Sequence, residues 1–202
     1  MFFGSLIFVT VGFPSLPWPW YLVIPLLAYG GVVSAVGPLR RTVPTLGVGR
    51  LGGMPLVCAV TLAVITSSVL MGFHALIRPD VEELAAKLPM HWFGNLLLAG
   101  AFFSVVNAAI EELIFRGILW ELVSDEWNNG VALCVTSLLF GLGHLHGYPP
   151  GLFGAILAAF YAITLGLLRW WTGGLGLGTA CHVGADATIF YILVETGALD
   201  AV

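Results

Sequence analysis

The sequence predicts an all-α protein: a polytopic bundle of transmembrane helices with six spans and room for a seventh at the N-terminus. Composition and the length of the apolar stretches carry this prediction. Of the 202 residues, 59% are hydrophobic and only 9% are charged, whereas a soluble domain carries roughly a quarter charged residues. The mean hydropathy is +1.00, and several stretches reach the roughly 20 apolar residues that a spanning helix needs.

The individual spans follow from the lengths of these stretches. Five are long enough to cross a bilayer, and one, 130–146, is shorter but continuous. The predicted spans are 18–37, 54–77, 92–123, 130–146, 152–171 and 174–196. Residues 1–13 are apolar but short for a span, so they form either a seventh span or an interfacial segment. Between the second and third spans, Asp80 and Glu83 have the spacing of a capping box at the start of a short surface helix.

The distribution of basic residues predicts the orientation. Arg40, Arg41 and Arg50 follow the first span, which places loop 38–53 in the cytoplasm by the positive-inside rule. The chain should therefore be an integral, multi-pass membrane protein, in the inner (plasma) membrane if the source is bacterial. Trp18 then falls at the outer boundary, where tryptophans form an aromatic belt.

The chain divides into three parts by the position of its polar motifs. Residues 1–91 hold the N-terminal spans and an interfacial loop, residues 92–196 form the core that carries the motifs, and residues 197–202 are a tail. The net charge is −4 and no run of basic residues occurs, so a nucleic-acid partner is not expected. The expected surroundings are the lipid bilayer.

The stretch "NAAIEELIFRG" places three charged residues inside the third span. A charge at a helix centre costs about 2.5–3.5 kcal/mol on insertion scales, so these charges need compensation. Glu112 and Arg116 stand one turn apart and can pair. Glu111 lies about 100° around the helix, on a stripe that runs back through Asn107 and Ser104. This polar stripe should face the bundle interior or a water-filled cavity.

Other spans bring ionisable groups to a similar depth. His144 comes one turn after Phe140 near the end of the 130–146 span, and His182 and Asp186 stand one turn apart on the last span. Glu111 and Asp186 lie about 18 Å, His144 about 21 Å and His182 about 12 Å from the cytoplasmic ends of their helices, at about 1.5 Å per residue. Three helices thus converge on one level, which predicts a single site.

These residue types suit hydrolysis by an activated water. A carboxylate and an imidazole that share one water can deprotonate it, and a second imidazole can donate to a developing oxyanion. No serine or cysteine stands in an evident nucleophile context, so covalent catalysis is not indicated. Alternatively, Glu111, His144 and His182 would form a zinc site with an open position. The motif H-E-x-x-H is absent, and spacing does not decide between the metal-free and metal-bound forms.

The segments "EELIFRG", "FGLGH" and "HVGAD" occur in this order on separate spans. Together they resemble the three motifs of the CPBP family of intramembrane proteases, which includes the type II CAAX prenyl endopeptidases and bacteriocin-processing members. The resemblance covers about residues 92–196. It implies that Glu111 activates a water held by His144, and that His182 and Asp186 help to stabilise the oxyanion.

The resemblance also implies supporting roles and leaves one role open. By this resemblance, Glu112 and Arg116 would support the structure of the site. We expect Asn107 and Phe140 to be supporting residues as well. The family places asparagine or aspartate where this chain has Asp186. Because an ionised aspartate cannot donate a hydrogen bond, Asp186 must be protonated, orient His182 or bind a metal.

Two classes of function follow. The favoured one is an intramembrane endopeptidase that uses Glu/His-activated water to cleave a membrane-anchored, lipidated or hydrophobic-tailed protein or peptide. This form needs no cofactor, whereas the metal-bound alternative would use a divalent ion such as zinc. The other class is a non-catalytic transporter or scaffold that binds hydrophobic or lipidated peptides, because polar residues at mid-depth also mark transport pathways.

Overall fold

The computed structural model describes residues 18–35, 47–88 and 94–199, and every regular element in these ranges is a helix. The helices are α2 (Trp20–Ala35), α3 (Gly53–Ile77), α4 (Glu82–Ala86), α5 (Leu96–Glu112), η3 (Leu113–Leu119), α6 (Trp120–Glu126), α7 (Asn129–Gly143), α8 (Gly151–Thr172) and α9 (Gly176–Leu199). The element η3 is a stretch of π-helix between α5 and α6. The all-helical prediction is confirmed for these ranges, and the segment predicted at residues 1–13 lies outside them.

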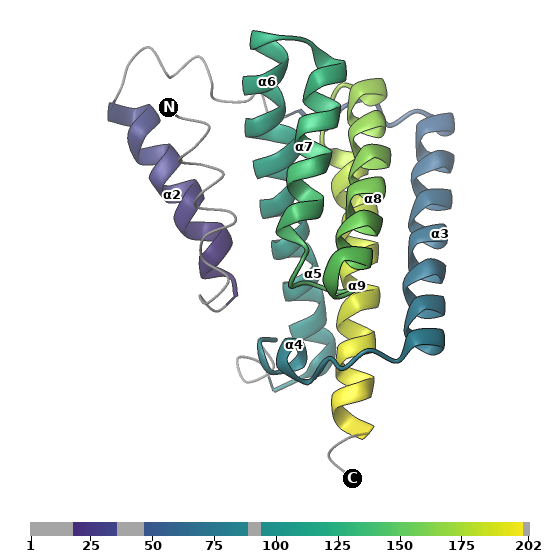
Figure 1. Ribbon diagram of the computed structural model, residues 1–202. Helices are drawn as coiled ribbons and strands as arrows, with labels where there is room; N and C mark the ends of the chain where they lie inside the picture. Colours follow the sequence, from purple (N-terminus) through teal and green to yellow (C-terminus); the bar gives the residue numbers. More distant parts are fainter. Residues whose placement is uncertain (1–17, 36–46, 89–93, 200–202) are drawn as a thin grey trace.

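The long helices run up and down beside one another (Figure 1). Helix α9 packs against α5 and α3, and α7 packs against α8 and α6. Helix α2 lies on one side of the bundle, where Leu22 packs with Ile114 and Phe115. Helix α3 lies on the opposite side. This arrangement places the end of α5, the end of α7 and the middle of α9 toward a common interior (Figure 1).

Among the described residues, four helices are long and apolar enough to cross a membrane: α3, the continuous helix Leu96–Glu126, α8 and α9. Helices α2 and α7 coincide with two further predicted spans but have only 16 and 15 residues. At 1.5 Å per residue they are about 22–24 Å long, less than a hydrocarbon core of about 30 Å. The protein is therefore an integral membrane protein, whereas the count of six or seven spans stays a prediction.

Local sequence explains where two of these helices begin. The side chain of Asn95 accepts hydrogen bonds from the backbone N–H groups of Leu97 and Leu98 at the start of α5. Asn128 accepts one from the N–H of Val131 at the start of α7. These caps satisfy donors that lack a partner within the first turn of a helix.

The predicted capping box of the short helix is wrong. Asp80 does accept a hydrogen bond from the N–H of Glu82, at 3.0 Å. Glu83, however, does not reach back, because its carboxylate pairs with the ammonium of Lys87 one turn later, at 2.7 Å. The helix α4 is also only five residues long.

The connection before α3 packs tightly against the turn between α8 and α9. The N–H of Arg50 donates to the carbonyl of Thr172, and the N–H of Gly176 donates to the carbonyl of Val48. A Cβ at Gly174 would lie 2.2 Å from the backbone nitrogen of Gly49, so this position accepts only glycine. The two connections thus lie at the same end of the bundle.

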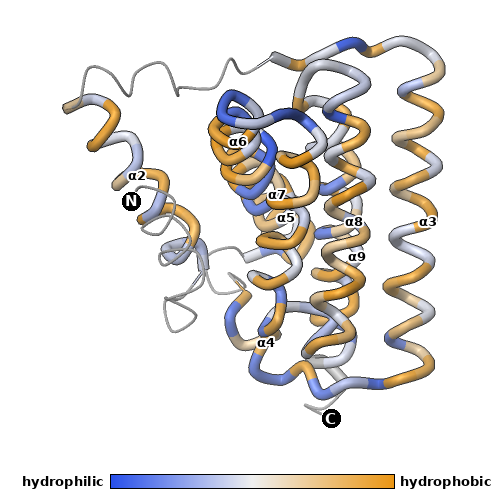
Figure 2. Tube along the Cα trace, turned by 45° about the horizontal axis from the view of Figure 1, so that its top comes forward, coloured by the Kyte–Doolittle hydropathy of each residue, from blue (hydrophilic) through white to orange (hydrophobic). Residues whose placement is uncertain are grey.

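The outer surface of the helices is apolar. Leu56, Val60 and Val64 of α3 are exposed, as is Phe160 of α8. Figure 2 shows apolar residues along α3 and α8, with polar residues gathered mainly at the connections. This surface suits lipid, in which the helices satisfy their own backbone hydrogen bonds.

Candidate functional site

Glu111 occupies the last turn of α5, directly before the π-helical stretch η3. The predicted polar stripe faces inward: Ser104, Asn107 and Glu111 are 1%, 7% and 6% exposed. A π-helical stretch within an α-helix is rare and frequently occurs at a functional site. The sequence pattern did not indicate η3, because its apolar residues suit an α-helix equally well.

Glu112 forms the predicted ion pair with Arg116, and it also binds a histidine. Its Oε1 accepts from Nη1 of Arg116 and from Nδ1 of His182, each at 2.9 Å. Arg116 donates a further hydrogen bond to the carbonyl of Ala162 on α8. All three charged or ionisable side chains are buried. Because a carboxylate only accepts, Nδ1 of His182 carries a proton and Nε2 points the other way.

Glu111 meets both predicted histidines. Its Oε2 lies 3.5 Å from Nε2 of His182 and 3.9 Å from Nε2 of His144. This oxygen is buried and has no hydrogen-bond partner among the described residues. A buried carboxylate oxygen without a partner is costly, and these distances are too long for direct hydrogen bonds. The arrangement therefore suits a small polar molecule between the carboxylate and the imidazoles.

His144 is fixed by Phe140, one turn earlier. Its Nδ1 donates to the backbone carbonyl of Phe140 at 2.8 Å, since a carbonyl can only accept. The two rings stack with centroids 4.2 Å apart. The guanidinium carbon of Arg116 lies over the Phe140 ring, 4.5 Å from its centroid. In its neutral form His144 therefore presents Nε2 as an acceptor toward Glu111.

Asp186 belongs to a second chain of buried contacts. Its Oδ2 accepts from Nδ2 of Asn107 at 3.2 Å, and Oδ1 of Asn107 accepts from the indole N–H of Trp18 at 3.0 Å. The other oxygen of Asp186 lies 3.8 Å from Nε2 of His182. Because Trp18 can only donate, it fixes the orientation of the Asn107 amide and so presents the amide nitrogen to Asp186.

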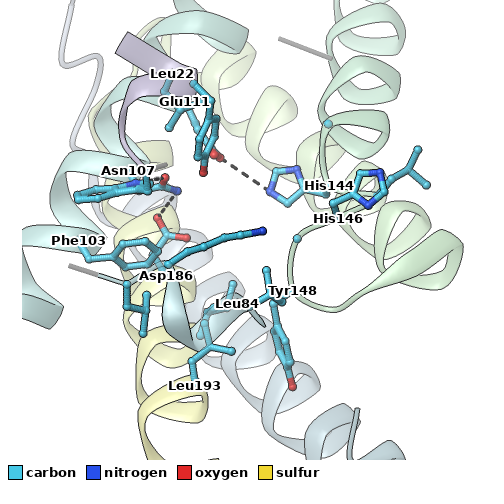
Figure 3. Close-up of a pocket in the computed structure, with 18 of the residues that line it drawn as sticks. Leu22, Leu84, Phe103, Asn107, Glu111, His144, His146, Tyr148, Asp186 and Leu193 are labelled. Carbon is cyan, nitrogen blue, oxygen red and sulfur yellow. Dashed lines mark hydrogen bonds and ion pairs between the residues drawn. The ribbon is translucent and has the colours of Figure 1, made fainter. Parts of the chain in front are cut away.

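These residues surround a cavity of about 270 Å³. Residues of α2, α4, α5 and α9, and of the end of α7 with the following turn, line the cavity. The polar and charged side chains in this lining are Tyr21, Lys87, Asn107, Glu111, His144, His146, Tyr148 and Asp186. Figure 3 shows Glu111 and His144 facing each other, with Asn107 and Asp186 joined beside them. His182 is not part of the lining and contacts Glu111 from the buried side.

The predicted metal alternative does not correspond to a preformed site. Among the described residues, no group of three or more His, Cys, Asp or Glu side chains is arranged to hold a metal ion. The Nδ1 atoms of His144 and His182 are already bonded, to Phe140 and Glu112. Only their Nε2 atoms face Glu111. The metal-bound form stays a prediction, and no step of the reaction is assigned to a metal.

The prediction for Trp18 needs correction. It was expected in an aromatic belt at the membrane boundary, but it is 5% exposed and bonded to Asn107, whereas Trp20 is 50% exposed. A buried indole usually finds an acceptor for its N–H. The polar stripe of α5 offered such an acceptor in Asn107, but the sequence gives no sign that α2 reaches it.

Comparison with known proteins agrees with the motifs. Residues 91–188 match the family model of the Rce1-like type II CAAX prenyl endopeptidases, and this range contains Glu111, His144, His182 and Asp186. No curated protein and no solved structure matches the chain. The match confirms the resemblance that the three motifs indicate. The chain is therefore an integral membrane protein in which residues 91–188 match an Rce1-like type II CAAX prenyl endopeptidase domain.

Proposed function

We propose that the protein is an intramembrane endopeptidase in which Glu111 activates a water for attack on a peptide bond of a membrane-associated substrate. The observation that carries the proposal is the buried, unpartnered Oε2 of Glu111, which faces Nε2 of both His144 and His182 at the edge of a cavity. A general base within reach of its water is the first geometric requirement of such a reaction.

In this proposal the water donates one hydrogen bond to Glu111 and one to His144. Nδ1 of His144 already carries its proton, so Nε2 is free to accept. The water oxygen attacks the carbonyl carbon as Glu111 takes one proton. In this step His182 is the imidazolium, with a proton on each ring nitrogen: Nδ1–H is held by Glu112, and Nε2–H donates a hydrogen bond to the developing oxyanion.

Collapse of the tetrahedral intermediate then breaks the C–N bond. Glu111 returns its proton to the leaving nitrogen, so that the products are a carboxylic acid and a free amine. Glu112 and Arg116 act by orienting His182, whose ring also packs edge-on against Phe140 and Tyr161. Asp186 is held at the cavity by Asn107.

The direct test is cleavage of an internally quenched, S-prenylated peptide that ends in a CAAX sequence, by the purified protein in detergent micelles. Turnover by the wild type, with products of the masses expected for one hydrolysed peptide bond, is the expected result. If the protein binds the peptide but never cleaves it, the scaffold or transporter class is favoured instead.

We expect Asp186→Asn to keep activity within about threefold of the wild type. Asparagine can accept from Asn107 through its oxygen, as Asp186 does now, and it also provides a permanent donor toward the cavity. The measurement is turnover of both proteins with and without a chelator. Severe loss in the variant, together with chelator-sensitive wild-type activity, would instead favour the metal-bound form.

Trp18→Phe should lower turnover about tenfold, because the Asn107 amide loses the donor that fixes its orientation. The matched control is Trp20→Phe, which alters an exposed ring two residues later, at the start of α2. A double-mutant cycle distinguishes positioning from packing: in an Asn107→Ala background, Trp18→Phe should have little further effect on turnover. Equal losses in both backgrounds would show that Trp18 does not act through Asn107.

A further inference from the structure

The cavity carries a lysine that the proposed reaction does not use. Lys87 follows α4 and lines the cavity together with Leu84 and Leu88. Val81 and Leu88 flank this short helix and are 3% and 5% exposed, in a cluster with Tyr148. The segment is thus anchored at both ends. It holds Lys87 at the solvent side of the cavity, where its side chain is 43% exposed, against 8% for Glu111.

The present partner of Lys87 is a carboxylate that can be exchanged. Nζ of Lys87 lies 2.7 Å from Oε1 of Glu83, whose side chain is 87% exposed. Exposed pairs of this kind contribute little to stability, because water solvates both charges well when they separate. The hydrogen bond from Lys87, with a smaller contribution from His146, lowers the pKa of the Glu83 carboxyl. Two cation-forming side chains of the cavity lining therefore lie near this carboxylate.

The two ends of the cavity differ in charge. Glu111 and Asp186 are buried at its inner end, and Lys87 stands at the outer end. The walls between them include apolar side chains such as Leu22, Phe103 and Leu193 (Figure 3). An anionic group on a bound peptide is repelled from the inner carboxylates and attracted to the ammonium.

We propose that Lys87 binds a carboxylate of the peptide substrate in exchange for Glu83, and so determines which end of the substrate lies at the outer end of the cavity. This inference rests on the proposed function. The carboxylate is either the C-terminal group of the peptide or an acidic side chain near its end. Lys87 is a specificity residue here, since it does not touch the reacting atoms.

Binding can be measured apart from chemistry in the Glu111→Gln protein. The probe is a fluorescein-labelled, S-prenylated CAAX peptide, with either a free carboxylate or an amide at its C-terminus, titrated in detergent micelles by anisotropy. The free-acid peptide should bind about tenfold more tightly than the amide, and adding Lys87→Gln should remove that difference. An amide peptide whose last residue is glutamate tests the second source: recovered Lys87-dependent binding assigns a side-chain carboxylate, and no recovery assigns the terminal one.

Glu83→Gln provides a test of opposite sign. It removes the competing carboxylate, so the free-acid peptide should bind about two- to threefold more tightly, with no change for the amide. Arg78→Gln is the matched control, because Arg78 is a cation on the connection between α3 and α4 that does not line the cavity. It should leave both dissociation constants unchanged.

The inference and the proposed function fail in different ways. Equal binding of acid and amide peptides, or an equal effect of Lys87→Gln on both, would overturn the role of Lys87 even if the wild type cleaves the peptide. Absence of cleavage by the wild type would overturn the protease proposal, while the binding difference would still report on Lys87. A role limited to stabilising α4 would alter the melting temperature without separating the acid peptide from the amide.

Discussion

Replacing Glu111 with glutamine is expected to lower peptide turnover by about 10²–10⁴-fold while the protein stays folded. Glutamine preserves the shape of the side chain but cannot take a proton from the water. The replacement should not disturb packing, because Oε2 of Glu111 has no hydrogen-bond partner among the described residues. The measurements are turnover of the prenylated peptide and the melting temperature in detergent.

Glu126→Gln is the matched control for this change. Glu126 ends α6, is exposed and lies outside the cavity lining. It should change neither turnover nor melting temperature. Near-full turnover by the Glu111→Gln protein would show that Glu111 is not the general base. Loss of all cleavage activity in the wild type as well would favour the binding and transport hypotheses.

Breaking the pair between Glu112 and Arg116 should have the largest effect on stability. Both side chains are 1% exposed and 2.9 Å apart. Removing either partner takes the closest opposite charge away from a buried ion, which typically costs about 3–5 kcal/mol. We expect Glu112→Gln and Arg116→Ala each to lower the melting temperature and the yield of folded protein, whereas Glu126→Gln lowers neither.

The double variant Glu112→Gln with Arg116→Met gives the contrasting case. It removes both charges and keeps much of the volume, so its stability should exceed that of either single variant. Turnover should still be low, because His182 loses the carboxylate that holds its Nδ1–H. Additive losses of stability in the double variant would show that the two charges do not compensate each other.

The sequence was most informative where burial is expensive. Three charges within a span demanded compensation, and this requirement alone predicted the Glu112–Arg116 pair and the inward stripe of Asn107 and Glu111. The depth estimates brought His144 and His182 to a similar depth in the membrane, although they differed by about 9 Å, and the structure places both within 4 Å of Glu111. The pair and the stripe follow from local spacing on one helix, whereas the convergence of the histidines follows from counting residues along separate spans.

Contacts between distant segments could not be predicted in this way. The hydrogen bond from Trp18 joins residues 89 positions apart, and that between Glu112 and His182 joins residues 70 apart. Neither has a signature in local periodicity. The length of α7 was overestimated for a different reason: the apolar run continues past Gly143, but His144 leaves the helical conformation and starts a turn.

Part of the cavity wall comes from outside the segment that carries the reacting groups. Glu111, His144 and Asp186 lie within residues 91–188, whereas α2 and α4 precede this range. Selection for a new substrate can therefore act on residues 21–22 and 84–88, which line the cavity without bonding to the hydrolytic centre. A library of variants confined to these two short stretches samples selectivity at constant chemistry, and exchange of the same stretches between homologues offers a route to grafting one substrate preference onto another centre.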